Sequence, residues 1–224
     1  MTRRGLVVAL DGPSGAGKSS AGRELASRLG YVYIDTGAMY RALALKALRA
    51  RAPLDSENDL VPLAQQSGIE LREGHVLLDG EDVTAAIRSR EVSGAASRVS
   101  VHPGVRREMV ARQREMGKPG GVVLDGRDIA TAVFPDAEVK IYVDADPSVR
   151  ASRRYAELRE AGEDADLAAV EREVRERDWN DSHRADSPLT RAPEAVLLDT
   201  TGLALHEVVA RMLEIVERAR GGAR

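Results

Sequence analysis

Short, largely apolar runs recur along the chain and predict the strands of a buried sheet. They are rich in Val, Ile, Leu and Ala and lie at residues 6–10, 31–35, 122–125, 138–144 and 195–199. Runs of this length without strict polar alternation are typical of parallel strands that are covered on both faces. The pattern therefore predicts a sheet of five core strands.

Helical spacing of apolar residues occupies most of the chain between these runs. Ala21, Leu25 and Leu29 recur at this spacing and stop at Gly30. Similar patterns lie at about residues 38–50, 56–67, 84–101, 104–116, 146–184 and 203–220. Strands that alternate with helices indicate an α/β fold with a doubly wound parallel sheet, whose ligands bind at the carboxyl ends of the strands.

Residues 69–83 depart from this rhythm. Apolar and polar residues there alternate about turn dipeptides such as Asp79-Gly80. This pattern predicts a small antiparallel ribbon, which we expect as an insertion on the main fold. Thr36 and Gly37 are expected to form the turn that precedes the 38–50 helix.

The stretch Gly12–Ser19, here called the phosphate loop, fits the pattern G-x-x-x-x-G-K-[ST]. It lies between the first predicted strand and the first predicted helix, as that motif requires. Its glycines allow the backbone N–H groups to surround a phosphate chain, and the helix N-terminus adds partial positive charge. Lys18 is expected to reach the outer phosphates, and the Ser19 hydroxyl to ligate Mg²⁺. The alternative is a glycine-rich turn that binds nothing.

Composition limits the other classes of function. A formal net charge of −3 provides no field to attract nucleic acid. Cysteine is absent, which excludes disulfides and thiolate chemistry. Apolar runs are too short for a membrane span, and the run after Arg4 is too short for a signal peptide. We therefore expect a cytoplasmic enzyme.

Two polar segments follow core strands. Asp125 ends the third run, where a carboxylate can hold Mg²⁺ through water; the alternative is a turn residue at the strand end. After the second run, Arg41 lies where its guanidinium can bind a second phosphate with two parallel hydrogen bonds, or it is an ordinary solvated arginine.

The segment from 150 to 184 is rich in both charges. Its arginines are Arg150, Arg153, Arg154, Arg159, Arg172, Arg175, Arg177 and Arg184. One interpretation is a solvated helical pair with many ion pairs. The other is a mobile lid that brings arginines to a transferring phosphoryl group, whose transition state spreads negative charge over its oxygens.

Residues 199–202, Asp-Thr-Thr-Gly, fit the D-x-x-G pattern of GTPases. They follow the last strand, and no N-K-x-D comes after them, so we discount a GTPase. The four histidines are too far apart along the chain to show metal-ligand spacing.

Four segments together resemble the bacterial cytidylate kinases, in order and over nearly the whole chain. They are residues 10–19 (LDGPSGAGKS), 35–41 (DTGAMYR), 124–129 (LDGRDI) and 176–184 (ERDWNDSHR). The resemblance implies transfer of the ATP γ-phosphoryl group to CMP or dCMP, with Mg²⁺, in a monomer. It also implies a core at 1–35, 118–150 and 185–224, a nucleoside-monophosphate lobe at about 36–117, and a lid with adjoining helices at about 151–184.

The resemblance assigns roles to individual residues. ATP is expected at Gly12, Pro13, Ser14, Gly15, Ala16, Gly17, Lys18, Ser19 and Ser20. The acceptor phosphate matches Arg41, Arg127 and Arg184; the cytosine matches Ser97, Arg106 and Asp128; the sugar matches Arg177 and Asp181; and Thr36 and Tyr40 match the pocket lining. The catalytic set implied is Lys18, Arg127, Asp128, Arg154 and Arg184.

Three questions stay open at this point. Relatives often carry Gly and then Thr after the lysine, whereas Ser19 and Ser20 stand here, so either serine is a candidate ligand of Mg²⁺. Another small-molecule kinase, shikimate-like or thymidylate-like, is the nearest alternative activity. A nucleotide-dependent switch or binding module is the alternative from another class.

Overall fold

The computed structural model describes residues 5–72, 74–160 and 162–222. Residues 1–4, 73, 161, 223 and 224 of the expected core, lobe and lid lie outside the described residues. The chain divides into two compact units. The first contains the chain up to Tyr33 and from Pro119 onward, and the second is Ile34–Lys118. Among the described residues, no helix combines the length and apolarity needed to cross a membrane.

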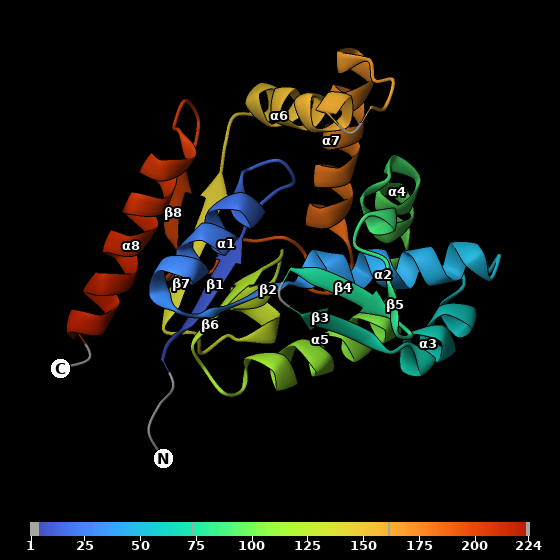
Figure 1. Ribbon diagram of the computed structural model, residues 1–224, viewed down its shortest axis with the longest axis horizontal. Helices are drawn as coiled ribbons and strands as arrows, with labels where there is room; N and C mark the ends of the chain where they lie inside the picture. Colours follow the sequence, from blue (N-terminus) through green and yellow to red (C-terminus); the bar gives the residue numbers. More distant parts are fainter. Residues whose placement is uncertain (1–4, 73, 161, 223–224) are drawn as a thin grey trace. The chain divides into compact units, whose positions relative to one another are not determined.

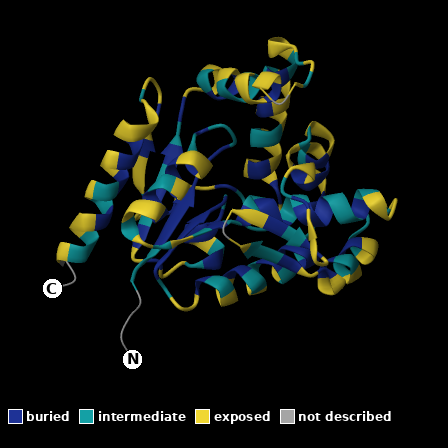
Figure 2. Cartoon of the chain, viewed as in Figure 1, coloured by how far each residue is buried: buried dark blue, intermediate teal, exposed yellow. Residues whose placement is uncertain are grey.

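The expected five-stranded sheet is confirmed, with strand order β2-β6-β1-β7-β8 (Figure 1). Its strands are β1 (Val7–Asp11), β2 (Val32–Asp35), β6 (Val122–Asp125), β7 (Val139–Asp144) and β8 (Val196–Asp199). β1 pairs in parallel with β6 on one side and with β7 on the other, and β7 pairs in parallel with β8. Strands β1 and β6 are almost fully buried (Figure 2), which explains their continuous apolar sequences, whereas buried and half-buried residues alternate along β7.

Helices α1 (Lys18–Leu29) and α8 (Leu205–Gly222) supply apolar side chains to the core of the first unit. Leu25 from α1 and Met212 from α8 join Leu10 of β1 in this core, and each is fully buried. Gly30, which the sequence marked as a stop, ends α1 in the left-handed conformation at φ 66°.

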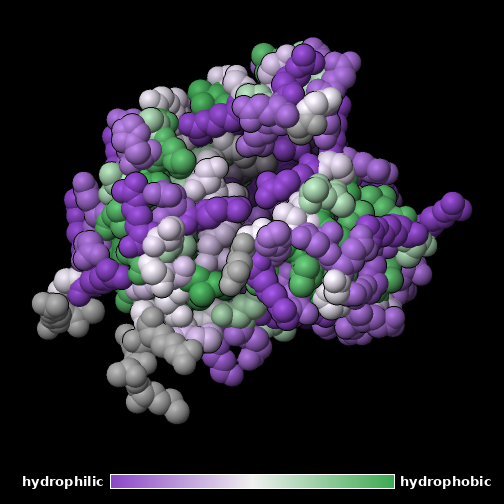
Figure 3. All heavy atoms as spheres, viewed as in Figure 1, coloured by the Kyte–Doolittle hydropathy of each residue, from purple (hydrophilic) through white to green (hydrophobic). Residues whose placement is uncertain are grey.

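Helices α6 (Pro147–Glu160) and α7 (Leu167–His183) share a small apolar cluster of their own. The cluster contains Ala151, Leu158, Val170 and Val174. Asp166 caps α7 by accepting a hydrogen bond from the Ala169 amide at 2.9 Å. The surface over the outer ends of both helices is mostly hydrophilic (Figure 3), as their charged sequences require.

The second unit has a separate helical core. Its helices are α2 (Thr36–Arg49), α3 (Glu57–Gln66), α4 (Arg90–Val99) and α5 (Pro103–Gly117), with a short 3₁₀ turn, η1, at Ala86–Arg88. Met39, Leu43, Leu60 and Met109 are fully buried among them. This core, like that of the first unit, contains few aromatic side chains.

The antiparallel ribbon is also confirmed, as a sheet of three strands in the order β3-β4-β5. These are β3 (Ile69–Arg72), β4 (His75–Leu78) and β5 (Glu81–Asp82). Asp79 and Gly80 connect β4 to β5 with positive φ angles of 51° and 87°. Two positive φ angles in succession are the requirement of a type I′ hairpin turn.

Two local predictions were wrong, and one short element was not predicted. Thr36 and Gly37 begin α2 rather than forming a turn, because the Asp35 carboxylate caps the helix at the Ala38 amide. The helix expected from residue 84 begins only at Arg90, because Ser89 supplies its N-cap. A π-helix, η2 (Ile129–Val133), was not predicted, since its side chains carry no helical periodicity of the usual kind.

Candidate functional site

The phosphate loop connects β1 to α1, as the sequence predicts. Gly12, Gly15 and Gly17 have φ angles of 144°, 76° and 87°, which L side chains rarely adopt. A Cβ atom at Gly12 would lie 1.9 Å from the Val143 carbonyl oxygen of β7. All three positions therefore favour glycine by their backbone conformation, and Gly12 is also required by close packing.

Lys18 is the first residue of α1, and only 4% of it is exposed. Its Nζ donates to the Pro13 carbonyl oxygen at 2.6 Å, within the loop. Burial, with a contribution from the charge of Arg127, lowers the pKa of Lys18 to about 7. A phosphate chain in the loop would favour the charged ammonium and raise this pKa again.

Ser19 and Asp125 come together at the carboxyl edge of the sheet. The Ser19 hydroxyl donates to Asp125 Oδ2 at 2.5 Å, and the Tyr33 hydroxyl donates to the same oxygen at 3.0 Å. A hydroxyl and a carboxylate are the hard oxygen ligands that Mg²⁺ takes alongside phosphate oxygens and water. These residues therefore fit Mg²⁺, and Ser19 is the serine of the pair that contacts the carboxylate.

Asp11, at the end of β1, holds the segment that carries Arg127 and Asp128. Its carboxylate oxygens accept hydrogen bonds from the Ile129 and Ala130 amides, each at 2.8 Å. Burial outweighs these two bonds and raises the pKa of Asp11 to about 6. In the sequence, Asp11 directly follows the first apolar run, but the sequence alone does not reveal this role.

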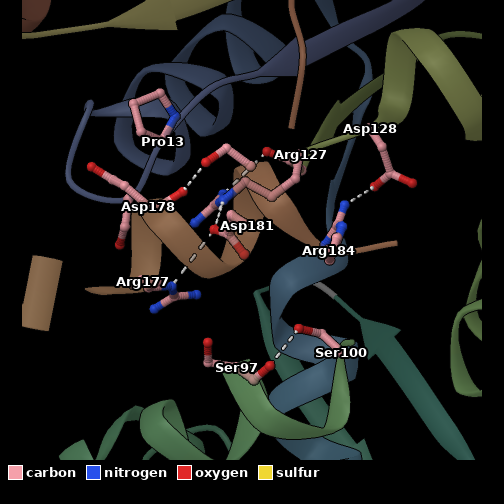
Figure 4. Close-up of polar contacts among 12 residues, drawn as sticks. Pro13, Ser97, Ser100, Arg127, Asp128, Arg177, Asp178, Asp181 and Arg184 are labelled. Atoms are coloured by element: carbon pink, nitrogen blue, oxygen red, sulfur yellow. Dashed lines mark hydrogen bonds and ion pairs between the residues drawn. The ribbon is translucent and has the colours of Figure 1, made fainter. Parts of the chain in front are cut away.

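Arg127 and Arg177 both point toward Asp181 of α7 (Figure 4). Arg127 Nε lies 2.8 Å from Asp181 Oδ2, and Arg177 Nε lies 4.0 Å from the same oxygen. Burial alone would raise the pKa of Asp181, but the two guanidinium groups outweigh it and the pKa is lowered. Asp181 is therefore an ionised carboxylate that fixes Arg127.

Arg184, immediately after α7, lies 3.4 Å from Asp128 Oδ1 through its Nη2 (Figure 4). It also donates from Nε to the Ser187 carbonyl oxygen at 2.8 Å. Both side chains of this pair are almost fully buried. The structure thus unites five predicted site residues in two ion-paired groups: Arg127, Arg177 and Asp181, and separately Asp128 and Arg184.

The arginines of α6 differ in their surroundings. Arg150 is 4% exposed and pairs with Asp178 of α7 at 2.6 Å. Arg153 donates to both the carbonyl and the hydroxyl of Thr200, at 2.8 and 3.0 Å. Arg154, the predicted catalytic residue, makes an ion pair with the exposed Glu157 of its own helix at 3.2 Å. The structure therefore does not bring Arg154 to the other candidates.

The second unit contains the remaining candidates. Arg41 pairs with Asp35 at 3.0 Å, beside Thr36 at the start of α2. Arg106 of α5 is 2% exposed, lies over the Tyr40 ring at 5.8 Å, and donates to the Ser100 carbonyl oxygen at 3.4 Å. Ser97 lies on α4, where its carbonyl accepts from the Ser100 hydroxyl (Figure 4).

Three residues of the first unit were not predicted as site residues: Asp11, Asp178 and Thr200. Their partners lie 28 to 184 positions away along the chain. Only the position of Asp11 and Thr200 directly at strand ends could have drawn attention to them.

Comparison with solved structures places the fold among known proteins. A shikimate kinase from Acinetobacter baumannii, solved in complex with shikimate, is 16% identical, with a TM-score of 0.51 over 96% of this chain and 95% of that one. An uncharacterized protein from Eubacterium ventriosum is 7% identical, with a TM-score of 0.54 over 95% and 98%. At these identities the comparisons show the fold alone.

Sequence comparison is more specific. A family described as Cytidylate kinase matches residues 8–218. The cytidylate kinase of Solibacter usitatus is 53% identical over 94% of this chain and 92% of its own length. That of Symbiobacterium thermophilum is 50% identical over 96% and 97%. Similarity of this extent shows that the chain belongs to the cytidylate kinase family.

Proposed function

We propose that this chain transfers the γ-phosphoryl group of ATP to CMP or dCMP, which yields ADP and CDP or dCDP. Membership of the cytidylate kinase family supports this reaction. The observation that carries the proposal lies in the first unit, where the buried Lys18 of the phosphate loop begins α1 and the neighbouring Ser19 contacts the Asp125 carboxylate at the end of β6. A cation and oxygen ligands placed in this way suit a transferring phosphoryl group.

The ATP side would use backbone and side-chain groups of the phosphate loop. The backbone N–H groups of residues 14–17 and the Lys18 ammonium would bind the phosphates. Ser19 would hold Mg²⁺ directly and Asp125 through water, because their oxygens lie together at the strand end. Bound there, Mg²⁺ would neutralise part of the charge on the phosphate oxygens.

The acceptor side would use the ion-paired residues. Arg127 and Arg184 are held by carboxylates in fixed positions, so each can present further N–H donors to the CMP phosphate, with Arg41 as a third cation. For the cytosine we propose Ser97, Arg106 and Asp128. For the sugar we propose Arg177 and Asp181, and for the lining Thr36 and Tyr40.

Three further features complete the proposal: a lid, a monomeric state and a cytoplasmic location. The segment at about 151–184 would act as a lid and would bring Arg154 to the phosphates. Its exposed partner Glu157 is one that solvent can replace, which would leave Arg154 available. The enzyme would act as a monomer in the cytoplasm. Size-exclusion chromatography would test the monomeric state, and cell fractionation would test the location.

A coupled assay of ADP release tests the proposed activity. The purified chain, ATP and Mg²⁺ would be combined in turn with CMP, dCMP, UMP, AMP, dTMP and shikimate. We expect release with CMP and dCMP far above that with the other acceptors. Release only with shikimate or dTMP would favour another small-molecule kinase. ATP binding without release on any acceptor would favour a nucleotide-dependent switch.

A further inference from the structure

Four carbonyl groups of the phosphate loop accept hydrogen bonds that help to fix its conformation. Pro13 accepts from Lys18, and Gly17 accepts from the Ala21 amide of α1. The carbonyls of Ser14 and Ala16 accept from side chains that lie far away in the sequence. We infer that these side chains, Arg150 and Thr200, are positioning residues that orient the phosphate loop for ATP.

Arg150 holds the Ser14 carbonyl. Its Nη1 donates to that oxygen at 3.2 Å and to Asp178 Oδ2 at 2.6 Å, while its Nε donates to the Ala145 carbonyl at 3.0 Å. The contact is tight, since a Cβ atom at Gly15 would lie 2.9 Å from the Arg150 carbonyl oxygen. Arg150 is therefore fixed by Ala145, which follows β7, and by Asp178 of α7 as well as by its contact with the loop.

Thr200 holds the Ala16 carbonyl. Its hydroxyl lies 3.0 Å from the Ala16 oxygen and 3.1 Å from the Asp144 oxygen. The Asp144 oxygen already receives the Thr200 amide at 2.8 Å, so the single hydroxyl proton is best used on Ala16. Arg153 donates to the hydroxyl oxygen and the carbonyl of Thr200, which fixes this side chain in turn.

The geometry of the peptide group gives these two contacts a consequence for binding. In a trans peptide the C=O and the following N–H point in opposite directions. Holding the Ser14 and Ala16 carbonyls toward Arg150 and Thr200 therefore aims the Gly15 and Gly17 amides away from these side chains, to the side where we place the phosphates. Both of these residues are glycines with positive φ angles, so little in their own conformation prevents the peptides from turning over.

A reversed peptide would present a carbonyl oxygen to the phosphates in place of an N–H. Repulsion would then replace a hydrogen bond at the same position. Arg150 and Thr200 thus act on ATP through the loop, without contacting ATP themselves. The same argument gives residues 199–202, which resemble a D-x-x-G pattern, a function in orienting the phosphate loop, since Thr200 is the buried residue of that turn.

This inference rests on the proposed use of ATP, and ATP binding can be measured apart from activity. Isothermal titration would give the dissociation constants of Mg-ATP, tripolyphosphate and CMP for wild type, Thr200→Val and Thr200→Ser. Tripolyphosphate is included because it lacks adenosine and meets the phosphate-binding groups alone. Thr201→Val is the matched control, since Thr201 is exposed and its hydroxyl accepts from the Asp146 amide, which lies outside the phosphate loop.

Thr200→Val should weaken Mg-ATP and tripolyphosphate alike, by about tenfold, because one buried hydrogen bond is lost. CMP binding should stay unchanged, and Thr200→Ser should restore both affinities. Weaker ATP with unchanged tripolyphosphate would overturn the inference, since Thr200 would then act on adenosine. Reduced thermal stability with unchanged affinities would overturn it too, because the role would be structural only.

Arg150 offers a second route if Thr200→Val does not fold. Asp178→Asn keeps the shape of the partner and removes its charge, which should loosen Arg150 and weaken tripolyphosphate by a smaller factor in the same direction. An Asp178→Asn variant that binds tripolyphosphate as wild type does would contradict the role of Arg150. Failure of the proposed function would look different: wild type would bind Mg-ATP normally but would not phosphorylate CMP.

Discussion

The two units hold their candidate arginines in different ways. In the first unit, Arg127 and Arg184 are each paired with a carboxylate that is about 8% exposed. In the second unit, Arg41 pairs with Asp35 at side-chain exposures of 24% and 19%. A charge removed from water needs its partner, whereas a charge near solvent can exchange its partner for water. The first unit is therefore built around carboxylates that it cannot lose without leaving a buried cation.

The largest expected effect follows from removing Asp181. Asp181→Ala removes the buried carboxylate from Arg127, whose own side chain is 18% exposed, which should lower the free energy of unfolding by about 3 kcal/mol. Denaturant unfolding followed by circular dichroism would measure this loss. Asp181→Asn, which keeps the volume and one acceptor, should lose less, and equal losses for the two variants would show that charge is not the cause.

The same variant tests the acceptor side of the proposed site. At a temperature where Asp181→Ala is folded, KM for CMP should rise far more than KM for ATP. The reason is that Asp181 fixes Arg127, which we place on the CMP phosphate. A change confined to KM for ATP would show that this pair serves the donor instead.

Lys18 is the contrasting buried cation of the first unit, because its bonded partner is a carbonyl of its own loop. Lys18→Ala should lower kcat by about 10²–10³-fold, as expected when a group that stabilises transition-state charge is lost. Its stability should be unchanged or higher, because burial disfavours the ammonium. A variant with nearly normal kcat would contradict the phosphate-loop assignment.

The pKa of Lys18 also predicts proton uptake on binding. In the free protein this pKa is about 7, so at pH 8 most Lys18 side chains are neutral. Phosphates favour the charged form, so Mg-ATP should bind with uptake of nearly one proton at pH 8 and should weaken as pH rises further. Calorimetry in buffers of different ionisation enthalpy would measure the uptake, and Lys18→Ala should abolish it.

The lowered pKa of Lys18 also predicts how folding stability depends on pH. The folded pKa of Lys18 lies below its unfolded value of 10.5, so the unfolded chain binds more protons between the two values. The contribution of Lys18 to the free energy of unfolding therefore increases as pH rises from about 7 to 10.5. Lys18→Ala should remove this dependence.

The smallest effect is expected in the second unit. Asp35→Asn keeps an acceptor for the Ala38 amide and removes the charge that faces Arg41, so stability should change by less than about 1 kcal/mol. Asp35→Ala also removes the helix cap and should cost about 1 kcal/mol. If these variants lost as much free energy of unfolding as Asp181→Ala, the two units would not differ in how strongly their ion pairs stabilise them.

The sheet and the phosphate loop could be predicted because their signals are local. The apolar runs identify each strand by its own sequence, and the loop is a continuous motif between a strand and a helix. The ribbon was predicted for the same reason, since Asp79-Gly80 encodes its own turn.

The ion pairs and the contacts of Thr200 could not be predicted from the residues alone. Asp181 lies 54 positions from Arg127, and Thr200 lies 184 positions from Ala16, so folding and not sequence spacing unites them. The resemblance named Arg127 and Asp181 separately but gave no pairing. The start of α4 was missed because Ser89 competes with equally polar residues near it as a helix cap.

Asp128 has two candidate roles that the structure makes easy to separate. Its carboxylate pairs with Arg184 at 3.4 Å, which suits a residue that only fixes an arginine. We propose that it also accepts from the N4 amine of cytosine, a group that uracil replaces with a carbonyl oxygen. In that role Asp128 would favour CMP over UMP, because its buried carboxylate would face the lone pairs of the uracil carbonyl oxygen instead of an N–H donor.

The most direct test of the proposed function is the ratio of kcat/KM for CMP to that for UMP, measured in wild type and Asp128→Asn. Wild type should prefer CMP by roughly a hundredfold or more, since two mismatched groups cost about 1–3 kcal/mol each. Asp128→Asn offers an amide donor to uracil, so kcat/KM for CMP should fall and the ratio should narrow by about tenfold. An equal loss with both nucleotides, which leaves the ratio unchanged, would contradict base recognition and leave Asp128 only the role of holding Arg184.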